Sequence, residues 1–425
     1  MNSTNLIKLT EWSEQLLDGV FFKDDIDRKV AQKLAESGIL EILEMRSGIL
    51  IKSNSYVGRV SLGNLHIQII PKLHGMPLIT LLQYTYGIRN LKLLHYAGFK
   101  IDHLNFFDLL IYTLYSYAED LFNRGLIKGY TGFEKELACV KGRIDISHIA
   151  NRGGIITATL PCKYYERNEN TQLNQVLLAG LRLAGNLASD NNLRHNVMRL
   201  CDQLSAFTEY IKLNKSVLIM AQRSISRLTD MYEPSLELIN ILYESQCAQI
   251  EDWAEQISLP GYFFDMNLFF EALVSKLLKN LGDEYSVVDQ YRLGMFFAYE
   301  PKRNPKGKRS PTPRPDFALL KNGLVEQLLD SKYRDLWDRN LPRDMLYQLA
   351  VYAVSGVGNQ SATILYPAMN GLPVPQQINV YNPLSNGIMA KVFIKPIDLI
   401  KVAGFIERGE NNGLSGYFTE VICYK

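Results

Sequence analysis

The sequence lacks several features that mark common classes of enzyme. It has six histidines, and all of them lie at or before His195. A histidine-based metal finger and a Ser-His triad are therefore excluded from the rest of the chain. No G-x-x-x-x-G-K-[ST] segment occurs either, so we expect that this chain binds and hydrolyses no nucleotide through a P-loop.

Cysteine and long apolar runs are also scarce. The five cysteines are scattered and form no C-x-x-C pair, which predicts reduced and mostly buried thiols rather than a disulfide framework or a zinc site. The first twelve residues lack the apolar core of a signal peptide, and no apolar run is long enough to span a membrane. We therefore expect a cytoplasmic protein without a membrane partner.

Charge of neither sign is in excess. The chain has 46 Lys and Arg against 44 Asp and Glu, a formal net charge of +2. Any binding of nucleic acid must therefore come from a local basic patch rather than from a global field. A length of 425 residues with 47% hydrophobic residues leaves room for two or three domains with a sizeable core.

The most informative stretch is RPDFALLKNGLVEQLLDSK, which runs from Arg314 to Lys332. Asn322-Gly323 predicts a tight hairpin turn between two short apolar strands. Side chains alternate along a strand, so Asp330 and Lys332 point to the same face. A regular hairpin would pair Asp316 with Leu329, one residue away from Asp330, and either a bulge or a three-residue loop would correct this register.

Two carboxylates and a lysine at one sheet edge suit a hard cation that prefers oxygen ligands. We expect Mg²⁺, with Mn²⁺ as an alternative, bound by Asp316 and Asp330. Such a metal would polarise a phosphate and activate a water, while Lys332 would hold the water or the developing charge. The opposing interpretation is an accidental surface pair, because D-x-K alone is a common pattern.

Further residues carry a resemblance to a known family. Pro315-Asp316 followed by Asp330-Ser331-Lys332 resembles the PD-(D/E)XK nuclease signature, and Gln348 and Tyr352 resemble its Gln-x-x-x-Tyr helix. Together these segments resemble the McrC family, the nuclease subunits of McrBC restriction systems. The run Asn267–Glu271 resembles the opening helix of this nuclease class, which implies that Glu271 faces the active site. The alternative is that Glu271 is an ordinary, partly exposed helix carboxylate.

The resemblance implies a function and a partner. It implies a Mg²⁺-dependent endonuclease that defends against foreign DNA by cleaving double-stranded DNA containing 5-methylcytosine. The motor would be an McrB-like AAA+ GTPase on another chain, whose GTP hydrolysis this chain stimulates. The implied catalytic residues are Asp316, Asp330 and Lys332, with Glu271, Gln348 and Tyr352 beside them.

A basic loop precedes the first acid. It contains proline and the residues Lys302, Arg303, Lys306, Lys308, Arg309 and Arg314. Such a run is often only a solvated loop. Its position directly before Asp316 favours contacts with DNA phosphates. A second basic turn, Lys141-Gly142-Arg143, either contacts DNA or a partner, or is a solvated turn that needs Gly142 for its backbone geometry.

The periodicity of the remaining sequence predicts an α+β multidomain protein. Residues 1–75 form a β-rich domain, which we expect to dock the partner; its elements are a helix over 24–37 and strands over 39–45, 49–52, 56–62 and 65–70. Residues 76–257 are mainly helical, over 78–88, 105–122, 171–187, 191–213 and 235–256, with a β insertion over 133–146.

Residues 258–425 form the predicted PD-(D/E)XK nuclease domain. Its α/β pattern has helices over 266–281 and 343–355 and strands over 285–290, 293–299, 317–320, 324–329, 362–366 and 390–393. The hairpin makes its sheet mixed rather than purely parallel.

Two alternatives stay open. The chain could be a repair or recombination nuclease of the same fold without a methyl-directed partner. It could also be a non-catalytic activator or scaffold, although a scaffold has no reason to keep Asp316, Asp330 and Lys332 together.

Overall fold

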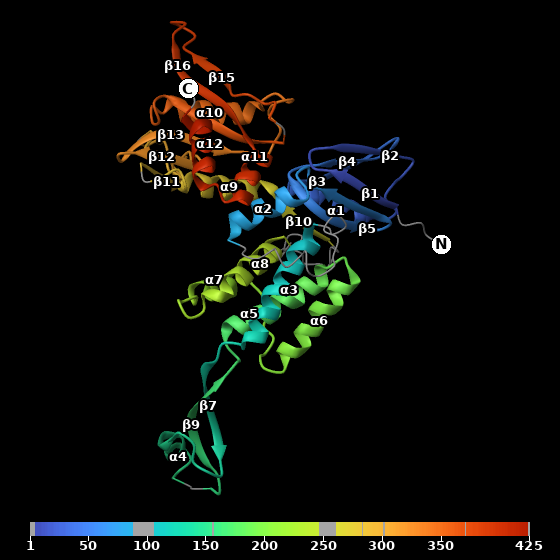
Figure 1. Ribbon diagram of the computed structural model, residues 1–425, viewed down its shortest axis with the longest axis vertical. Coiled ribbons are helices and arrows are strands. Elements are labelled where there is room, and N and C mark those ends of the chain that lie inside the picture. Colours follow the sequence, from blue (N-terminus) through green and yellow to red (C-terminus); the bar gives the residue numbers. More distant parts are fainter. Residues whose placement is uncertain are drawn as a thin grey trace. The chain divides into compact units, whose positions relative to one another are not determined.

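The computed structural model (Figure 1) describes residues 5–87, 106–154, 157–245, 261–282, 284–300, 302–369 and 371–423. The chain forms two compact units, one made of residues 1–89 with 256–425 and the other of residues 90–255. Helices and four sheets occur in the described residues, and two of these sheets mix parallel and antiparallel pairs. The predicted α+β class with mixed sheets is confirmed.

The N-terminal part of the first unit holds two sheets and two helices. The predicted helix and four strands are present as α1 and β3 to β6, within two residues of their expected ends. The elements are β1 (Asn5–Thr10), β2 (Glu14–Asp18), α1 (Asp25–Glu36), β3 (Leu40–Met45), β4 (Gly48–Ser53), β5 (Tyr56–Leu62), β6 (Leu65–Ile70) and α2 (Met76–Tyr86). The sequence reasoning missed β1 and β2, which are short, and β2 is largely exposed.

A strand from beyond the helical unit completes one of these sheets. β10 (Gly261–Asp265) pairs with β5 in a sheet of order β1-β6-β5-β10. Gly58 of β5 has φ +152°, and a Cβ atom there would lie 2.0 Å from the carbonyl oxygen of Tyr262. Residues 1–75 therefore do not complete this sheet by themselves, and the three consecutive domains stay a prediction.

The second unit is mainly helical, as its periodicity predicts. Its helices are α3 (Phe106–Arg124), α5 (Gln172–Leu187), α6 (Asn191–Ser205), α7 (Lys215–Arg223), the 3₁₀ turn η3 (Asp230–Tyr232) and α8 (Glu233–Glu244). The hydroxyl of Thr171 caps α5 by accepting from the amide of Asn174. The helix predicted over 191–213 ends at Ser205, and the predicted helical ends at 88, 105 and 246–256 lie outside the described residues.

An arm of two long strands extends from these helices at the bottom of Figure 1. It contains β7 (Gly129–Leu137), β8 (Arg143–Ile144), α4 (Ile146–Asn151) and β9 (Leu160–Asn168), with β9 between the other two strands. Gly142 has φ +69°, and a Cβ atom there would lie 2.5 Å from the carbonyl oxygen of Lys163. The backbone therefore requires glycine in the Lys141-Gly142-Arg143 turn, whatever its cations bind.

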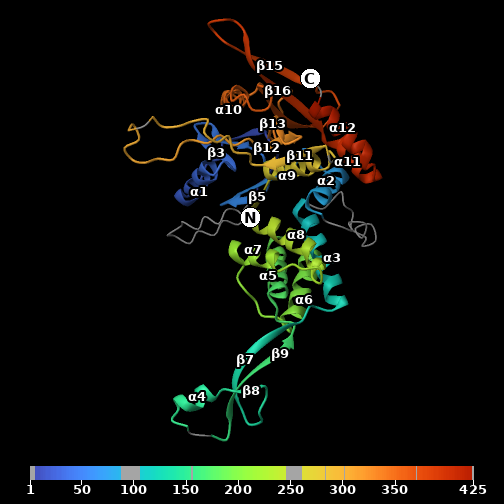
Figure 2. The ribbon, with the colours of Figure 1, turned by 90° about the vertical axis from the view of Figure 1, so that its left-hand side faces the viewer.

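A six-stranded mixed sheet forms the C-terminal part of the first unit. Its order is β11-β12-β13-β14-β16-β15. The elements are α9 (Met266–Lys279), β11 (Tyr285–Asp289), β12 (Phe317–Lys321), β13 (Leu324–Ser331), α10 (Arg343–Val354), β14 (Ser361–Ala368), β15 (Gln376–Tyr381), β16 (Ile388–Asp398), α11 (Leu399–Arg408) and α12 (Asn411–Cys423). α10 covers one face, and α9, α11 and α12 lie toward the other (Figure 2).

The hairpin between β12 and β13 contains a bulge, the first of the two predicted corrections, and keeps its two-residue turn. Lys321 pairs with Leu324 across the Asn322-Gly323 turn, where both residues have positive φ. The register then shifts between Leu319 and Leu320, and Phe317 pairs with Leu329. Asp316 is thereby brought opposite Asp330, because the bulge supplies the extra residue that a regular hairpin lacks.

One predicted strand is wrong. Residues 293–299 form no strand; Leu293 is buried, and the chain turns at Gly294 and Met295. The apolar residues that suggested a strand include Leu293 and Phe296, which contact the core from a loop. Among the described residues, no helix is both long and apolar enough to cross a membrane.

Candidate functional site

Three charged side chains meet where β12 begins and β13 ends. The Lys332 ammonium lies 2.8 Å from Asp330 Oδ2 and 3.6 Å from Asp316 Oδ2, and it donates to the carbonyl oxygen of Ser331 at 3.1 Å. Asp316 Oδ2 also accepts from the amide of Ser331 at 2.9 Å and from its hydroxyl at 3.1 Å. The hairpin therefore fixes both carboxylates around one cation.

Burial makes this cluster electrostatically tight. The side chain of Asp330 is only 2% exposed. Burial and the neighbouring Asp316 raise the pKa of Asp330 to about 6, although Lys332 opposes the rise. Burial lowers the pKa of Lys332, but the two aspartates outweigh it, so the net pKa is raised and the ammonium keeps its charge.

The helix α10 holds the pair from one side. Gln348 Nε2 donates to Asp330 Oδ1 at 3.4 Å and to the hydroxyl of Tyr352 at 2.6 Å. That hydroxyl in turn donates to the carbonyl oxygen of Arg314 at 3.0 Å, two residues before Asp316. Gln348 and Tyr352 thus link both acid-bearing strands, which makes them positioning residues in this geometry.

Glu271 of α9 faces the same cluster. Its carboxylate accepts from Gln290 Nε2 at 2.9 Å. Burial and the nearby charge of Asp316 raise its pKa, and Lys332 acts in the opposite direction. All six residues predicted for the catalytic site are therefore brought into one neighbourhood, although their catalytic roles stay a prediction.

The six cations of the basic loop lie apart from these contacts. All six residues are exposed, and in the ranges that the structure describes their side chains form no ion pair. The loop between β11 and β12 stands out from the sheet (Figure 2). Backbone bonds anchor its ends: Gln290 N donates to the Asp316 carbonyl at 2.7 Å, and Leu293 N donates to the Pro313 carbonyl at 3.0 Å.

The donor set fits a divalent cation. Asp316, Asp330 and Glu271 place three carboxyl groups near the single ammonium of Lys332, so the cluster has surplus negative charge. No three His, Cys, Asp or Glu side chains in the described ranges are close enough to form a metal site by themselves. Asp316 and Asp330 would therefore be supplemented by a carbonyl oxygen and waters, a ligand set that Mg²⁺ commonly keeps.

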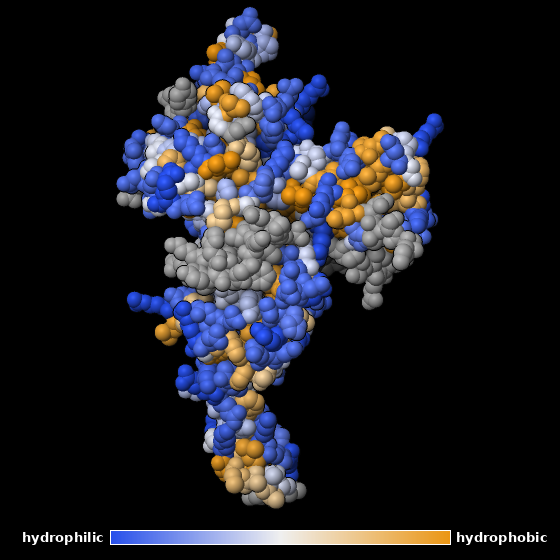
Figure 3. Space-filling model, turned by 45° about the vertical axis from the view of Figure 1, so that its right-hand side comes forward, coloured by the Kyte–Doolittle hydropathy of each residue, from blue (hydrophilic) through white to orange (hydrophobic). Residues whose placement is uncertain are grey.

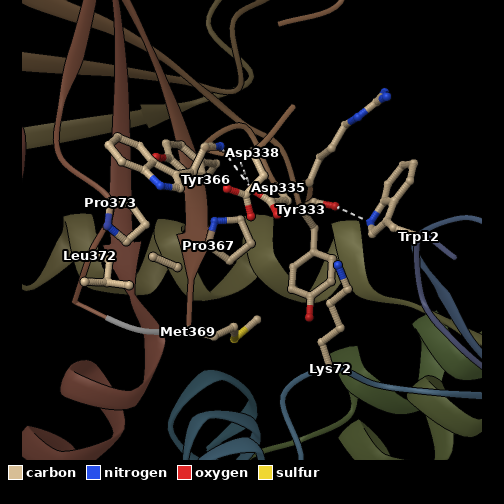
Figure 4. A pocket seen from close by; sticks show the side chains of 13 residues that line it. Trp12, Lys72, Tyr333, Asp335, Asp338, Tyr366, Pro367, Met369, Leu372 and Pro373 are labelled. Carbon is tan, nitrogen blue, oxygen red and sulfur yellow. Dashed lines mark hydrogen bonds between the residues drawn. The ribbon is translucent and has the colours of Figure 1, made fainter. Parts of the chain in front are cut away.

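The sequence reasoning missed the residues that hold the segment after Lys332. Trp12, which has φ +57°, donates its indole N–H to the Tyr333 carbonyl at 3.0 Å (Figure 4). The Tyr333 amide donates to Asn267 Oδ1 at 3.2 Å, and its ring packs edge-on against Phe270. Arg334 stacks over the Trp12 ring at 5.0 Å. No local pattern in the sequence signals this contact, because Trp12 and Tyr333 lie 321 positions apart along the chain.

A buried glutamate completes this contact. Glu11 Oε1 accepts from the Tyr333 hydroxyl at 2.8 Å and from the Lys72 amide at 2.6 Å, while Oε2 has no partner among the described atoms. The residue is fully buried. Burial raises the pKa of Glu11 to about 7, although the hydrogen bonds from Lys72 and Tyr333 act to lower it. These bonds tie the N-terminal sheet to the residue that follows Lys332. A cavity of about 210 Å³ borders Trp12 and Tyr333.

Comparison with known proteins identifies the family. Residues 51–367 match the family model described as "McrBC 5-methylcytosine restriction system component". The chain belongs to this family. The matched range includes the whole acidic cluster and the Gln348/Tyr352 helix.

One solved structure shares the fold of this McrBC-family chain. A chain of the refined half-complex from the tetradecameric assembly of Thermococcus gammatolerans McrB AAA+ hexamers with bound McrC is 18% identical, with a TM-score of 0.61. The alignment covers 96% of this chain and 100% of that chain. A chain of the T. gammatolerans McrBC complex is 19% identical over 66% of this chain and 89% of that one, with a TM-score of 0.48. No curated protein matches.

The buried Glu11 predicts a pH effect on stability. Its pKa is about 7 in the folded chain against an ordinary 4.5, so the unfolded chain loses the proton first as pH rises. The free energy of unfolding therefore falls by up to about 3 kcal/mol as the pH rises from 4.5 to 7. Glu11→Gln removes this loss, so the variant should gain stability relative to the wild type over that range.

Urea unfolding followed by tryptophan fluorescence at pH 5 and pH 8 measures the difference. Glu14→Gln, an exposed neutralisation nearby, is the matched control and should leave it unchanged. If the free energy of unfolding changes equally between pH 5 and pH 8 in Glu11→Gln and in the wild type, Glu11 does not cause the pH dependence.

Proposed function

We propose that this chain is the DNA-cleaving subunit of an McrBC-like restriction complex, with a nuclease domain of the PD-(D/E)XK class in its C-terminal part. The observation that carries the proposal is the Asp316–Lys332–Asp330 cluster on the bulged hairpin, in which Asp330 is buried and the other two side chains are half-buried. Family membership supports the restriction role, and the fold likeness to a structure of McrB hexamers with bound McrC supports the assembly.

The roles of the residues follow from the cluster's geometry. Asp316 and Asp330 would hold Mg²⁺ or Mn²⁺, which when bound supplies Lewis acidity toward a phosphate oxygen and an acidified water. Lys332 forms ion pairs with both aspartates and would stabilise the negative charge that develops on the attacked phosphate. Through their hydrogen bonds, Gln348 and Tyr352 hold Asp330 and the Arg314 backbone in position.

The surrounding surface fits a phosphate backbone. The cations of the loop from Lys302 to Arg314 are exposed, and the residue two positions after Arg314 is the first acid. Phosphate contacts from such a loop would set the DNA against the cluster without reading its sequence. The proposed substrate is double-stranded DNA that carries 5-methylcytosine, in keeping with the family description.

The N-terminal sheets offer a surface for an AAA+ partner of the McrB type. Leu16 of β2 and Leu43 of β3 both pair with Leu50 of β4, so they form a row on one face. Leu16 and Leu43 are 42% and 40% exposed, and Met45 is 47% exposed. Figure 3 shows apolar surface over this part of the chain. Docking there is the proposed route to GTPase stimulation.

Two other readings differ in what they require. A repair nuclease of the same fold would need the same cluster but no AAA+ partner. A scaffold without activity would not need a carboxylate that is 2% exposed beside a second carboxylate, because burying unneeded charge is costly. The cluster therefore favours an enzyme, and the partner distinguishes the restriction subunit from the repair nuclease.

Removing one acid should separate cleavage from assembly. Asp330→Asn preserves the shape and the Gln348 contact but removes the charge that would bind the cation, so cleavage should fall at least about a hundredfold. Stimulation of the partner's GTP hydrolysis should persist, because the N-terminal surface is unchanged. Cleavage of methylated DNA and GTP hydrolysis are measured on the same preparation.

Asp344→Asn, an exposed aspartate in the first turn of α10, is the matched control and should keep both activities. Full cleavage by Asp330→Asn would refute the proposed site. Loss of GTPase stimulation together with cleavage, in a folded variant, would refute the separation of the two functions.

The basic loop should contribute to binding more than to chemistry. Replacing Lys306, Lys308 and Arg309 with alanine should weaken DNA binding and lower its salt slope by up to about 3, since each lost phosphate contact removes about 0.9. Cleavage at saturating DNA should change much less. Fluorescence anisotropy at several salt concentrations measures the slope.

The control removes three exposed lysines from elsewhere, Lys23, Lys29 and Lys215, with the same change in net charge. If both triple variants bind DNA with the wild-type affinity and salt slope, the loop is a solvated linker.

A further inference from the structure

One apolar side chain at the rim of the proposed active site is almost fully in solvent. Met295 is 99% exposed, and its φ is +61°, a backbone conformation that non-glycine residues rarely adopt. It follows Gly294 in the turn that replaces the predicted strand over 293–299. An exposed methionine in a left-handed conformation is unfavourable by itself, so the neighbouring contacts must hold it there.

Those contacts are strong on both sides of the turn. Leu293 is 4% exposed and belongs to the core cluster that includes Leu349 and Tyr352 of α10, and Phe296 packs against the same cluster. Phe296 also meets the ring of Phe297 edge-on, with centroids 4.7 Å apart. The contacts of Leu293 and Phe296 therefore fix the backbone of the turn that carries Met295.

The turn lies on the face of the sheet that bears the acidic cluster. Leu293 belongs to the same core cluster as Tyr352, whose hydroxyl accepts from Gln348, and Gln348 also donates to Asp330. The Leu293 amide also bonds to the Pro313 carbonyl, three residues before Asp316. DNA that reaches the acidic cluster over this face would meet the turn at its edge.

Charge around the turn indicates what Met295 contacts. Arg292 is exposed on one side, and the cations from Lys302 to Arg314 follow on the other. Phe297 and Tyr299 beside the turn are also 43% and 41% exposed, so its apolar surface is a small group dominated by Met295. A broad apolar patch would fit a protein, but a small apolar group between cations fits a nucleic acid whose phosphates meet the cations. Architectural DNA-binding proteins insert methionine, leucine or phenylalanine between base pairs in this way and thereby kink the duplex.

We propose that Met295 is a wedge that inserts between adjacent base pairs of the bound duplex while the basic loop contacts the flanking phosphates. The inference rests on the proposed function, since it takes DNA as the substrate. Insertion unstacks one base step and bends the duplex toward the Asp316–Asp330 cluster. Pyrimidine–purine steps, which unstack most easily, would be preferred.

Base unstacking is measured directly with 2-aminopurine, whose fluorescence rises when it leaves the stack. The full chain is bound to duplexes that contain 5-methylcytosine and carry 2-aminopurine at successive positions, with Ca²⁺ in place of Mg²⁺ to avoid cleavage. Fluorescence anisotropy of the same samples confirms saturation. The wild type should raise the fluorescence several-fold at one step, Met295→Leu should keep the rise, and Met295→Ala should lose it.

A matched control comes from another exposed apolar residue. Leu384 is 96% exposed on the hairpin between β15 and β16, so Leu384→Ala removes a similar side chain far along the chain from the proposed DNA contacts. It should leave the fluorescence rise intact. Because Met295 is exposed, Met295→Ala should fold like the wild type.

The outcomes separate this inference from the function on which it rests. Saturated binding without a fluorescence rise, or an equal rise with Met295→Ala, would overturn the wedge and leave the nuclease proposal standing. Absence of DNA binding by the wild type would overturn both. Unchanged unstacking together with loss of AAA+ partner binding in Met295→Ala would assign the residue to a protein contact, which also overturns the wedge.

Discussion

The repulsion between the buried carboxylate of Asp330 and the half-buried carboxylate of Asp316 is the constraint on which the site depends. Asp316 and Asp330 are held together by the bulged hairpin, and the Lys332 ammonium alone bridges them among the described side chains. Without compensation, two such acids would not both stay ionised. The hairpin, the ammonium and the bonds from α10 oppose that repulsion, and they leave a surplus of negative charge suited to a divalent cation.

The segment that follows β13 is hydrogen-bonded to the residues that follow β1 of the N-terminal sheet. Tyr333 follows Lys332 directly, and Trp12 and Glu11 bond to its carbonyl oxygen and its hydroxyl. β10 further joins this sheet to the polypeptide that enters α9, the helix that carries Glu271. A displacement of the N-terminal sheet would therefore move the segment that follows Lys332, which offers a physical link between the proposed docking surface and the proposed cleavage site.

Much of this arrangement was predictable from local sequence. The Asn322-Gly323 turn and the one-residue mismatch at Asp316 predicted the bulge, and the 3.6-residue period predicted α10 with Gln348 and Tyr352 on one side. Long-range pairing was not predictable: β10 joins β5 across about two hundred residues of chain, and no local pattern announces it. Trp12 and Glu11 were missed for the same reason, and residues 293–299 resembled a strand because the buried Leu293 and the partly buried Phe296 contact the core from a loop.

Direct binding of a metal tests the central claim without any assay of activity. Metal-free full-length chain is titrated with Mn²⁺, and the free ion is followed by electron paramagnetic resonance, with Mg²⁺ as competitor. The account predicts saturable Mn²⁺ binding that Mg²⁺ displaces, which Asp330→Asn abolishes and Asp344→Asn preserves. Equal Mn²⁺ binding by the wild type and Asp330→Asn would contradict it.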